Sequence, residues 1–142
     1  MAVDEQHRQS FEEQLKKANE SNPFMIHKHI RATVLSEKTS QVRAEIGADA
    51  LNAMGGVHGG LMFVMAEIAA GLVTRNDGRR YVTLDSSFRF IRGTDSSQDL
   101  AAEGTIVKRG RTVCFTKASV KEAESGKLLA EGDFTFYCLD AE

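Results

Sequence analysis

Glu67 stands in the middle of a long apolar run. Residues 61–73 are otherwise apolar or glycine, and a helix that is apolar on all sides is a buried helix. A carboxylate in such surroundings is costly unless it is solvated or paired, and no Lys or Arg lies one helical turn away. Function is a common reason for such a charge, so we predict that Glu67 is a catalytic carboxylate. The alternative is that the helix has one wetted edge, on which Glu67 lies.

A glycine-rich loop leads into this helix. Gly59 and Gly60 begin the helix, where backbone N–H groups are unpaired and the helix dipole adds positive potential. Such an end can stabilise the oxyanion of a polarised carbonyl, and glycine lets a substrate approach the backbone closely. The alternative is that the two glycines only form a tight turn.

The spacing of these two features predicts a shared site. Gly59 and Glu67 are eight residues apart, or about 12 Å along a helix at ~1.5 Å per residue. Groups that act on one carbonyl must lie within roughly 3–3.5 Å of its atoms. One helix cannot easily do both, but two antiparallel copies can. We therefore expect Gly59 of one subunit to face Glu67 of the other, with two sites in a dimer.

Besides the buried helix, the sequence pattern predicts an N-terminal helix and six strands. Residues 4–20 show helical spacing, which ends before Pro23 because the residue before proline disfavours the helical region. Alternating apolar and polar residues predict strands. These strand segments are 30–34, 42–46, 81–90, 98–108, 112–123 and 127–138.

In the strand at 81–90, regular alternation places Val82, Leu84, Phe88 and Phe90 on one face and Thr83 on the other. The order of elements predicts an α+β fold in which an antiparallel sheet curls around the buried helix. The sheet edge and the exposed side of the helix would still need cover, which indicates a homodimer at least, with a homotetramer as a further expectation.

The combination of Asn52, His58-Gly59-Gly60 and Glu67 resembles the signature of hotdog-fold acyl-CoA thioesterases of the phenylacetate-degradation (PaaI) type. The resemblance covers about residues 30–138. It implies a hotdog domain at 24–142 with an N-terminal helical extension at 1–23.

The resemblance also implies roles for the site residues. Glu67 would act as the nucleophile or as a general base on water, Asn52 would hold that water or the thioester, and the Gly59 N–H would form the oxyanion hole. His58 would mainly position the loop; a hydrogen-bonded loop histidine is at least as good an account of it.

Two departures from the family pattern bear on the mechanism. Many PaaI-type members have Asp where this chain has Glu67. In having Glu at this position, the chain is similar to the related 4-hydroxybenzoyl-CoA thioesterase branch. That branch has a Thr one turn later, where this chain has Gly71. We expect Thr83, on the next strand, to supply a hydroxyl instead.

The substrate implied is a small or medium acyl- or aryl-CoA. CoA carries phosphates, so its site should offer cations. The five candidates are Arg89, Arg92, Lys108, Arg109 and Arg111. The alternative for Lys108, Arg109 and Arg111 is that they only form a solvated hairpin tip.

Composition narrows the remaining classes. The net charge of −2 argues against a dedicated nucleic-acid binder. The longest apolar stretch is far shorter than the ~20 residues of a membrane span, and the polar start shows no signal peptide, so we expect a soluble cytoplasmic protein. Cys114 and Cys138 are expected to be free thiols. The reaction needs no metal or redox cofactor, and we expect none; CoA enters only as part of the substrate.

Two alternatives share the fold. A non-catalytic acyl-CoA sensor would keep the pocket and lose the acid, so Glu67 argues against it. The second is a hotdog hydratase or dehydratase, a class that resembles this chain in fold. The acyl-carrier-protein dehydratases of that class have a catalytic His at the position where this chain has Ala53, which disfavours this alternative.

Overall fold

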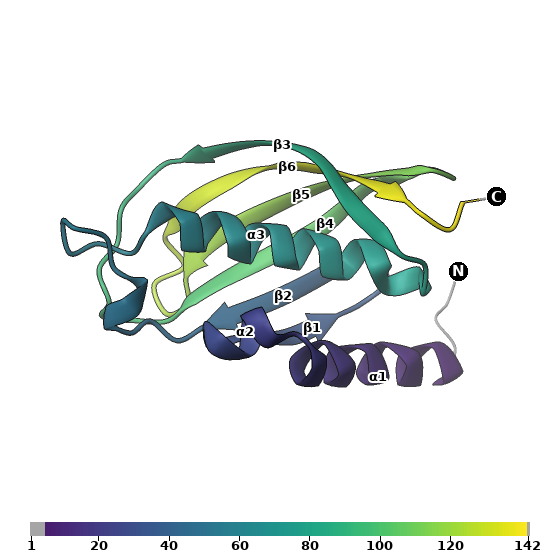
Figure 1. Cartoon of the computed structure of the whole chain (residues 1–142), viewed down its shortest axis with the longest axis horizontal. Helices are drawn as coiled ribbons and strands as arrows, with labels where there is room; N and C mark the ends of the chain where they lie inside the picture. Colours follow the sequence, from purple (N-terminus) through teal and green to yellow (C-terminus); the bar gives the residue numbers. More distant parts are fainter. Residues whose placement is uncertain (1–4, 142) are drawn as a thin grey trace.

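The computed structural model describes residues 5–141. Its six strands form one antiparallel sheet that curves around the helix α3, as Figure 1 shows. The strand order is β1-β2-β4-β5-β6-β3. The helices are α1 (Glu5–Ser21), α2 (Pro23–His27) and α3 (Gly59–Thr74), with short 3-10 turns at Ala48–Ala50 and Arg75–Asp77. The strands are β1 (Ile30–Leu35), β2 (Thr39–Ala44), β3 (Tyr81–Phe90), β4 (Leu100–Arg109), β5 (Val113–Glu122) and β6 (Leu128–Cys138).

This architecture confirms the predicted sheet wrapped around a central helix, with an additional N-terminal helix. The predicted helix at 4–20 corresponds to α1, although residue 4 lies outside the described residues. Helix α2 was not predicted. Pro23 occupies its first turn and the Asn22 side chain accepts a hydrogen bond from the Met25 N–H, so the residue that ends one helix also begins the next.

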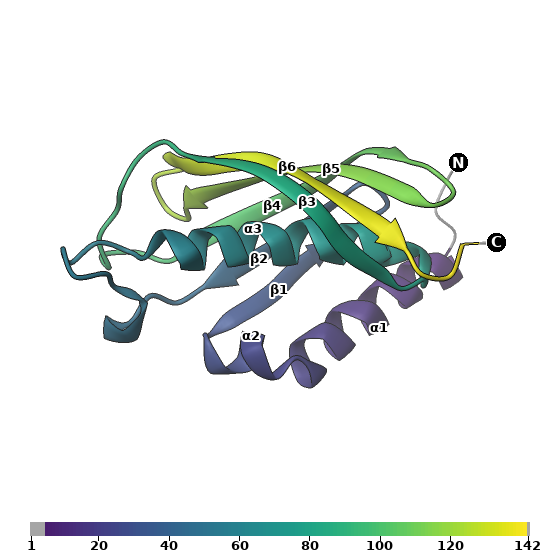
Figure 2. The same cartoon turned by 45° about the horizontal axis from the view of Figure 1, so that its top comes forward.

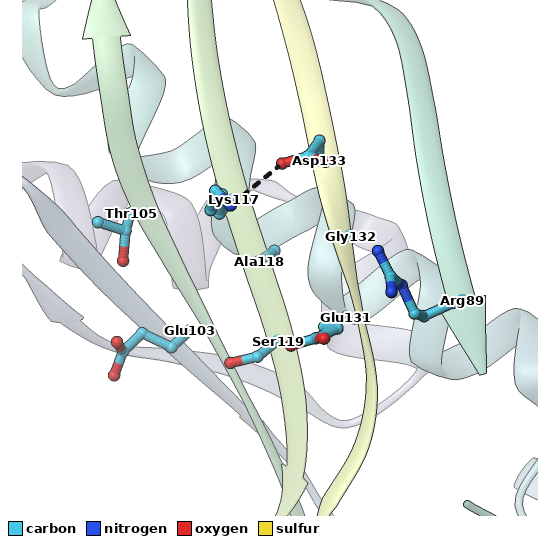
Figure 3. A pocket seen from close by; sticks show the side chains of 9 residues that line it. All are labelled: Arg89, Glu103, Thr105, Lys117, Ala118, Ser119, Glu131, Gly132 and Asp133. Atoms are coloured by element: carbon cyan, nitrogen blue, oxygen red, sulfur yellow. Dashed lines mark ion pairs between the residues drawn. The ribbon is translucent and has the colours of Figure 1, made fainter. Parts of the chain in front are cut away.

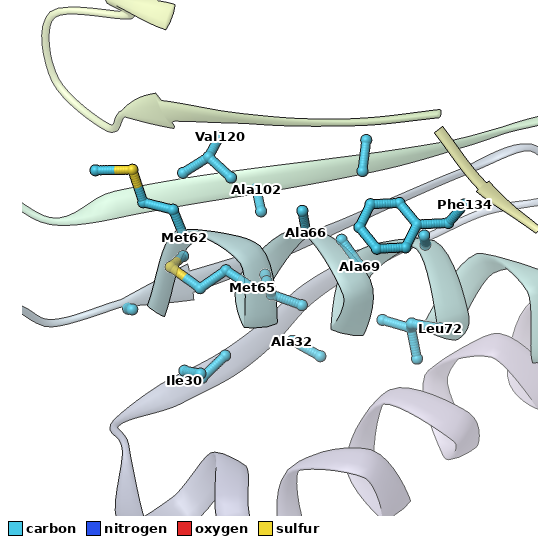
Figure 4. Packing of buried hydrophobic residues seen from close by; sticks show 14 of the residues in the cluster. Ile30, Ala32, Met62, Met65, Ala66, Ala69, Leu72, Ala102, Val120 and Phe134 are labelled. Carbon is cyan, nitrogen blue, oxygen red and sulfur yellow. The ribbon is translucent and has the colours of Figure 1, made fainter. Parts of the chain in front are cut away.

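Small residues let α3 lie close to the sheet. Ala66, Ala69 and Ala70 are fully buried on the helix, and Gly104 of β4 faces them. A Cβ at Gly104 would lie 2.6 Å from the Ala69 carbonyl oxygen, so only glycine permits this approach. The Ser40 hydroxyl donates to the same carbonyl. Figure 4 shows the larger side chains around this contact, among them Met62, Met65, Leu72, Val120 and Phe134.

Helix α1 covers one edge of the sheet. The Asn19 side chain accepts a hydrogen bond from the Ala32 N–H at 2.7 Å and donates to the Ala32 carbonyl at 2.9 Å. An amide side chain thus satisfies backbone groups of edge strand β1, and Phe11 of α1 is buried. Figure 2 shows α1 and α2 beside β1, on the side of the molecule where α3 is not enclosed by the sheet.

Strand β3 forms the opposite edge and contains a bulge that the sequence pattern did not predict. Its pairing with β6 shifts register between Thr83 and Asp85. Thr83 and Phe88 therefore both face α3, through contacts with Glu67 and Phe63. The prediction of opposite faces for Thr83 and Phe88 was wrong, because one extra residue in a strand reverses the alternation.

The exposed apolar side chains of β3 gather along this free edge. Val82, Leu84 and Phe90 are 45%, 56% and 57% exposed, and no other strand among the described residues pairs with β3 beyond β6. A long apolar edge strand is a surface for pairing with another chain. No described helix combines the length and apolar character needed to cross a membrane.

Candidate active site

Glu67 is half-buried on the side of α3 that the sheet leaves open. The Thr83 hydroxyl on β3 donates a hydrogen bond of 3.1 Å to its Oε1 atom. The bulge in β3 turns Thr83 toward the helix, so the hydroxyl expected from the sequence does lie beside the carboxylate. Helix α3 is accordingly not apolar on every side; Leu61, Val64 and Ile68 flank Glu67 and are also half-buried.

A cation near Glu67 was missed by the sequence analysis. Arg75, the C-cap residue of α3, follows Glu67 by eight residues and interacts electrostatically with it. Its side chain passes over Gly71, where a Cβ would lie 2.9 Å from Nη1. Side chains on a helix lean toward its N-terminus, so Arg75 leans back toward Glu67 once position 71 has no side chain. The signal in the sequence was the i, i+4, i+8 spacing of a carboxylate, a glycine and an arginine.

The loop that carries Asn52 is held by that residue itself. Asn52 Oδ1 accepts hydrogen bonds from the Met54 N–H at 2.9 Å and the Gly56 N–H at 3.1 Å. The residue between these two donors, Gly55, has a φ of +82°, which glycine adopts without steric cost. The side-chain amide nitrogen of Asn52 has no hydrogen-bond acceptor within residues 5–141. It remains available to a ligand.

His58 forms the N-cap of α3. Its Nδ1 atom accepts a hydrogen bond of 2.9 Å from the Gly60 N–H, and a Cβ at Gly60 would lie 3.0 Å from the same nitrogen. An accepting Nδ1 places the proton of the neutral ring on Nε2. The histidine and second glycine therefore make one local cap.

The first glycine of the helix has a different environment. The Gly59 N–H has no acceptor in the part of the chain that the structure describes, and the Phe90 ring packs 3.1 Å from where its Cβ would be. This N–H lies at the positive end of the α3 dipole. Within one chain it is eight helical residues from Glu67, about 12 Å along the axis.

Two cavities lie along the open side of α3. One, of about 390 Å³, adjoins the helix N-terminus and is lined by residues that include His58, Gly60, Leu61 and Val64. The other, of about 570 Å³, lies between α1, α2 and the second half of α3, against Ile68, Leu72 and Arg75. Both volumes are within the ordinary range of small-molecule sites. Met54, in the loop before α3, is 93% exposed and lines neither of these cavities.

The five predicted cations are dispersed, and one of them has internal partners. Arg109 donates to the Thr74 carbonyl at 2.8 Å, to Asn76 at 2.8 Å and to Asp77 at 3.0 Å, so it closes the C-terminal end of α3. These contacts disfavour a role for Arg109 in binding phosphate. Lys108 and Arg111 are exposed beside it, and Arg92 is exposed near the other end of the helix.

Arg89 lies on the outer face of the sheet. It lines a hollow over β3–β6, together with Glu131 and the ion pair between Lys117 and Asp133 at 4.0 Å (Figure 3). This hollow and α3 are on opposite faces of the sheet.

The end of α3 also holds Asp77 and Tyr81. Burial tends to raise the pKa of Asp77, but hydrogen bonds from Tyr81 and Arg79 and the charge of Arg109 outweigh it and keep that pKa below its ordinary value. Burial, with the bond to Asp77, raises the pKa of Tyr81 to about 12. These shifts belong to a hydrogen-bonded cluster that fixes the helix end.

Comparisons with known proteins agree on one family. The family model described as the thioesterase superfamily matches residues 54–129, more than half of the chain. The human protein named acyl-coenzyme A thioesterase 13 is 25% identical over 109 residues, 74% of this chain and 78% of that protein. A putative esterase of Deinococcus radiodurans is 28% identical over 95 residues, 67% of this chain and 64% of that protein.

Solved structures show the same fold. A mutant of the phenylacetic acid degradation protein PaaI from Thermus thermophilus superposes with a TM-score of 0.78 at 25% identity, over 83% of this chain and 100% of that chain. The PaaI protein of E. coli has a TM-score of 0.88 at 16% identity, over 94% of this chain and 96% of that chain. The second likeness extends through most of the N-terminal helices.

Proposed function

Because the chain belongs to the thioesterase superfamily, we propose that it hydrolyses an acyl-CoA to the free acid and CoA, with Glu67 as the catalytic carboxylate. Membership confirms the predicted hotdog fold and the predicted class of thioester hydrolase. The choice of CoA rests on the acyl-coenzyme A thioesterases among its relatives. The acyl group proposed is small or medium, aliphatic or aryl.

Glu67 can serve the reaction in two ways. As a general base it takes a proton from water, whose oxygen attacks the thioester carbon; the C–S bond then breaks and the CoA thiolate takes up a proton. As a nucleophile its oxygen attacks the thioester carbon, the C–S bond breaks and the CoA thiolate leaves and takes up a proton, and water then hydrolyses the resulting anhydride. In both cases the carbonyl oxygen becomes negative, and the Gly59 N–H is the donor we assign to it.

The two groups meet when two chains associate. The free edge of β3 and the half-buried stripe of α3 adjoin each other, so one contact between two copies would cover both. An antiparallel arrangement of the two α3 helices puts Gly59 of one subunit opposite Glu67 of the other. We therefore propose a homodimer with two shared sites as the minimal active unit, and a homotetramer of such dimers as the larger assembly.

The other predicted residues receive supporting roles. The free amide nitrogen of Asn52 would donate to the water or the thioester, Thr83 would orient the Glu67 carboxylate, and His58 would hold the loop. Lys108, Arg111, Arg92 and Arg89 remain candidates for the phosphates of CoA, with Arg89 the least favoured because it faces away from α3. The proposal includes no metal or redox cofactor.

One observation supports the proposal most directly. Glu67 is half-buried on an otherwise apolar stripe, where it accepts a hydrogen bond from Thr83 but forms no ion pair within 4.0 Å with the described side chains, those of residues 11–141. A carboxylate kept at that cost is expected to have a function.

The proposal is tested by measuring thiol release from a panel of acyl-CoA thioesters, with Glu67→Gln and Glu67→Ala beside the wild type. We expect the wild type to cleave at least one member, and both substitutions to reduce kcat by about 10²–10⁴-fold, the usual range for a lost acid–base group. Circular dichroism of both variants controls for folding.

Two outcomes would contradict it in different ways. If the wild type released no thiol from any thioester but bound CoA, the protein would be a sensor. If both variants kept full activity, the protein would be a thioesterase in which Glu67 has no catalytic part.

A further inference from the structure

The Arg75 guanidinium interacts electrostatically with Glu67, and among the side chains that the structure describes, those of residues 11–141, it has no hydrogen-bond or ion-pair partner. Arg75 lines a hollow and is still reached by solvent. The surrounding protein lowers its pKa, and the charge of Glu67 opposes that shift. A guanidinium has five N–H donors, so in such a hollow it is suited to an anionic ligand.

The hollow is the 570 Å³ cavity between α1, α2 and α3. Met25, Ile68 and Leu72 give it an apolar floor, and its cations include Lys17 and Arg75. None of the described residues that line it is a carboxylate. Arg79, a further cation in the described lining, is already paired with Asp77 at 2.9 Å. The cavity therefore suits a ligand with an apolar body and a negatively charged end.

The position of Arg75 indicates which end of the substrate it meets. In CoA the whole pantetheine arm separates the thioester from the nearest phosphate. Arg75 leans back over Gly71 toward Glu67, so when Glu67 acts on the thioester carbon this guanidinium lies nearer to that carbon than an extended pantetheine arm would place the nearest phosphate. A negative group on Arg75 must therefore belong to the acyl part of the substrate.

We propose that Arg75 and this cavity form the acyl subsite, and that they select acyl groups that end in a carboxylate. This inference rests on the proposed function and names its substrate class: CoA thioesters of dicarboxylic acids. The apolar chain lies over Ile68 and Leu72, and the terminal carboxylate binds Arg75 in the bidentate geometry that guanidinium favours. Gly71 leaves room for the Arg75 side chain in this position, since a Cβ there would lie 2.9 Å from Nη1 of Arg75.

The test compares glutaryl-CoA with valeryl-CoA, which have equal carbon chains and differ in the terminal carboxylate. The ratio of their kcat/KM values is measured for the wild type and for Arg75→Met. We expect the wild type to prefer glutaryl-CoA by about tenfold or more, and Arg75→Met to lower that ratio by about 10- to 100-fold, the effect of losing one charge-assisted hydrogen-bonded pair. Arg80→Met is the matched control, because it removes the same charge from a surface pair with Asp140 outside the cavity. We expect it to leave the ratio unchanged.

Binding provides a readout that does not depend on turnover. The thioether analogues of both substrates, in which a methylene replaces the carbonyl, are titrated calorimetrically into the wild type and Arg75→Met. Tighter binding of the carboxylate analogue that is lost in Arg75→Met supports the subsite even if no thioester is cleaved, in which case only the proposed function fails.

Equal binding of the two analogues by the wild type would overturn the inference. An Arg75→Met variant that slows both thioesters in the same proportion would overturn it too, because Arg75 would then act on Glu67 and not on the acyl group.

Discussion

Glu67 lies between a neutral donor and a cation. Thr83 donates to Oε1 from the neighbouring strand, while Arg75 interacts with it from two turns along the same helix. The hydroxyl fixes the direction of one carboxylate oxygen, because a hydrogen bond has a preferred geometry. The charge of Arg75 has no such directional demand at this range. We therefore assign orientation of the carboxylate to Thr83 and recognition of the acyl group to Arg75.

Removing the Thr83 hydroxyl tests the first of these assignments. We expect Thr83→Val to lower kcat by about 10- to 100-fold, since a hydrogen bond to a charged group contributes roughly 1.5–3 kcal/mol and each 1.36 kcal/mol of barrier is a factor of ten. Steady-state kinetics with the best thioester of the panel measures it.

Thr83→Ser is the conservative control for this prediction. It keeps the hydroxyl and should recover most of the rate. A valine variant as fast as the serine variant would show that the bond to Glu67 does not position the carboxylate.

At the scale of elements, the site depends on how closely α3 lies against β4. Gly104 sets this distance, because the Ala69 carbonyl occupies the space that any side chain would need. Glu67 lies two residues before Ala69 on the same helix. A helix pushed away from the sheet would also move Glu67 relative to Thr83, which is on a different strand.

We expect Gly104→Ala to lower the free energy of unfolding by about 1–3 kcal/mol, as overpacking in a core does. Gly93→Ala is the matched control, because a Cβ at Gly93 meets nothing within 4 Å; surface substitutions of this kind usually stay within about 0.5 kcal/mol. Urea denaturation of both variants measures the difference. Equal stabilities would mean that α3 and β4 do not approach this closely.

Much of this arrangement could be predicted from the sequence, because hydrophobic periodicity is local. The strands alternate with a period of two and α1 shows helical spacing, while α3 is a continuous apolar run in which Glu67 is conspicuous. The bulge after Thr83 could not be predicted, since it is decided by pairing with β6. Arg75 was missed for a similar reason. Its relation to Glu67 spans two helical turns and depends on the missing side chain of Gly71, so it does not appear in the residues one turn from Glu67.

At the scale of the whole molecule, a single chain leaves three features incomplete. The edge of β3 is unpaired beyond β6 and carries exposed apolar side chains. One stripe of α3 is only half-covered. The Gly59 N–H has no acceptor among the described residues and is remote from the Glu67 of its own chain. A second copy placed antiparallel along β3 and α3 would complete all three at once.

Mixing two inactive variants tests this sharing most directly. Glu67→Gln removes the carboxylate, and Gly59→Pro removes the N–H at the first helical position, where proline is otherwise tolerated. Each variant alone should be nearly inactive. In a mixed dimer, one of the two sites takes Gly59 from the first chain and Glu67 from the second.

After the two variants are unfolded together and refolded, random pairing predicts about a quarter of wild-type thioesterase activity, because half of the dimers are mixed and each has one intact site. Activity no greater than that of the separately refolded variants would contradict a site built from two chains.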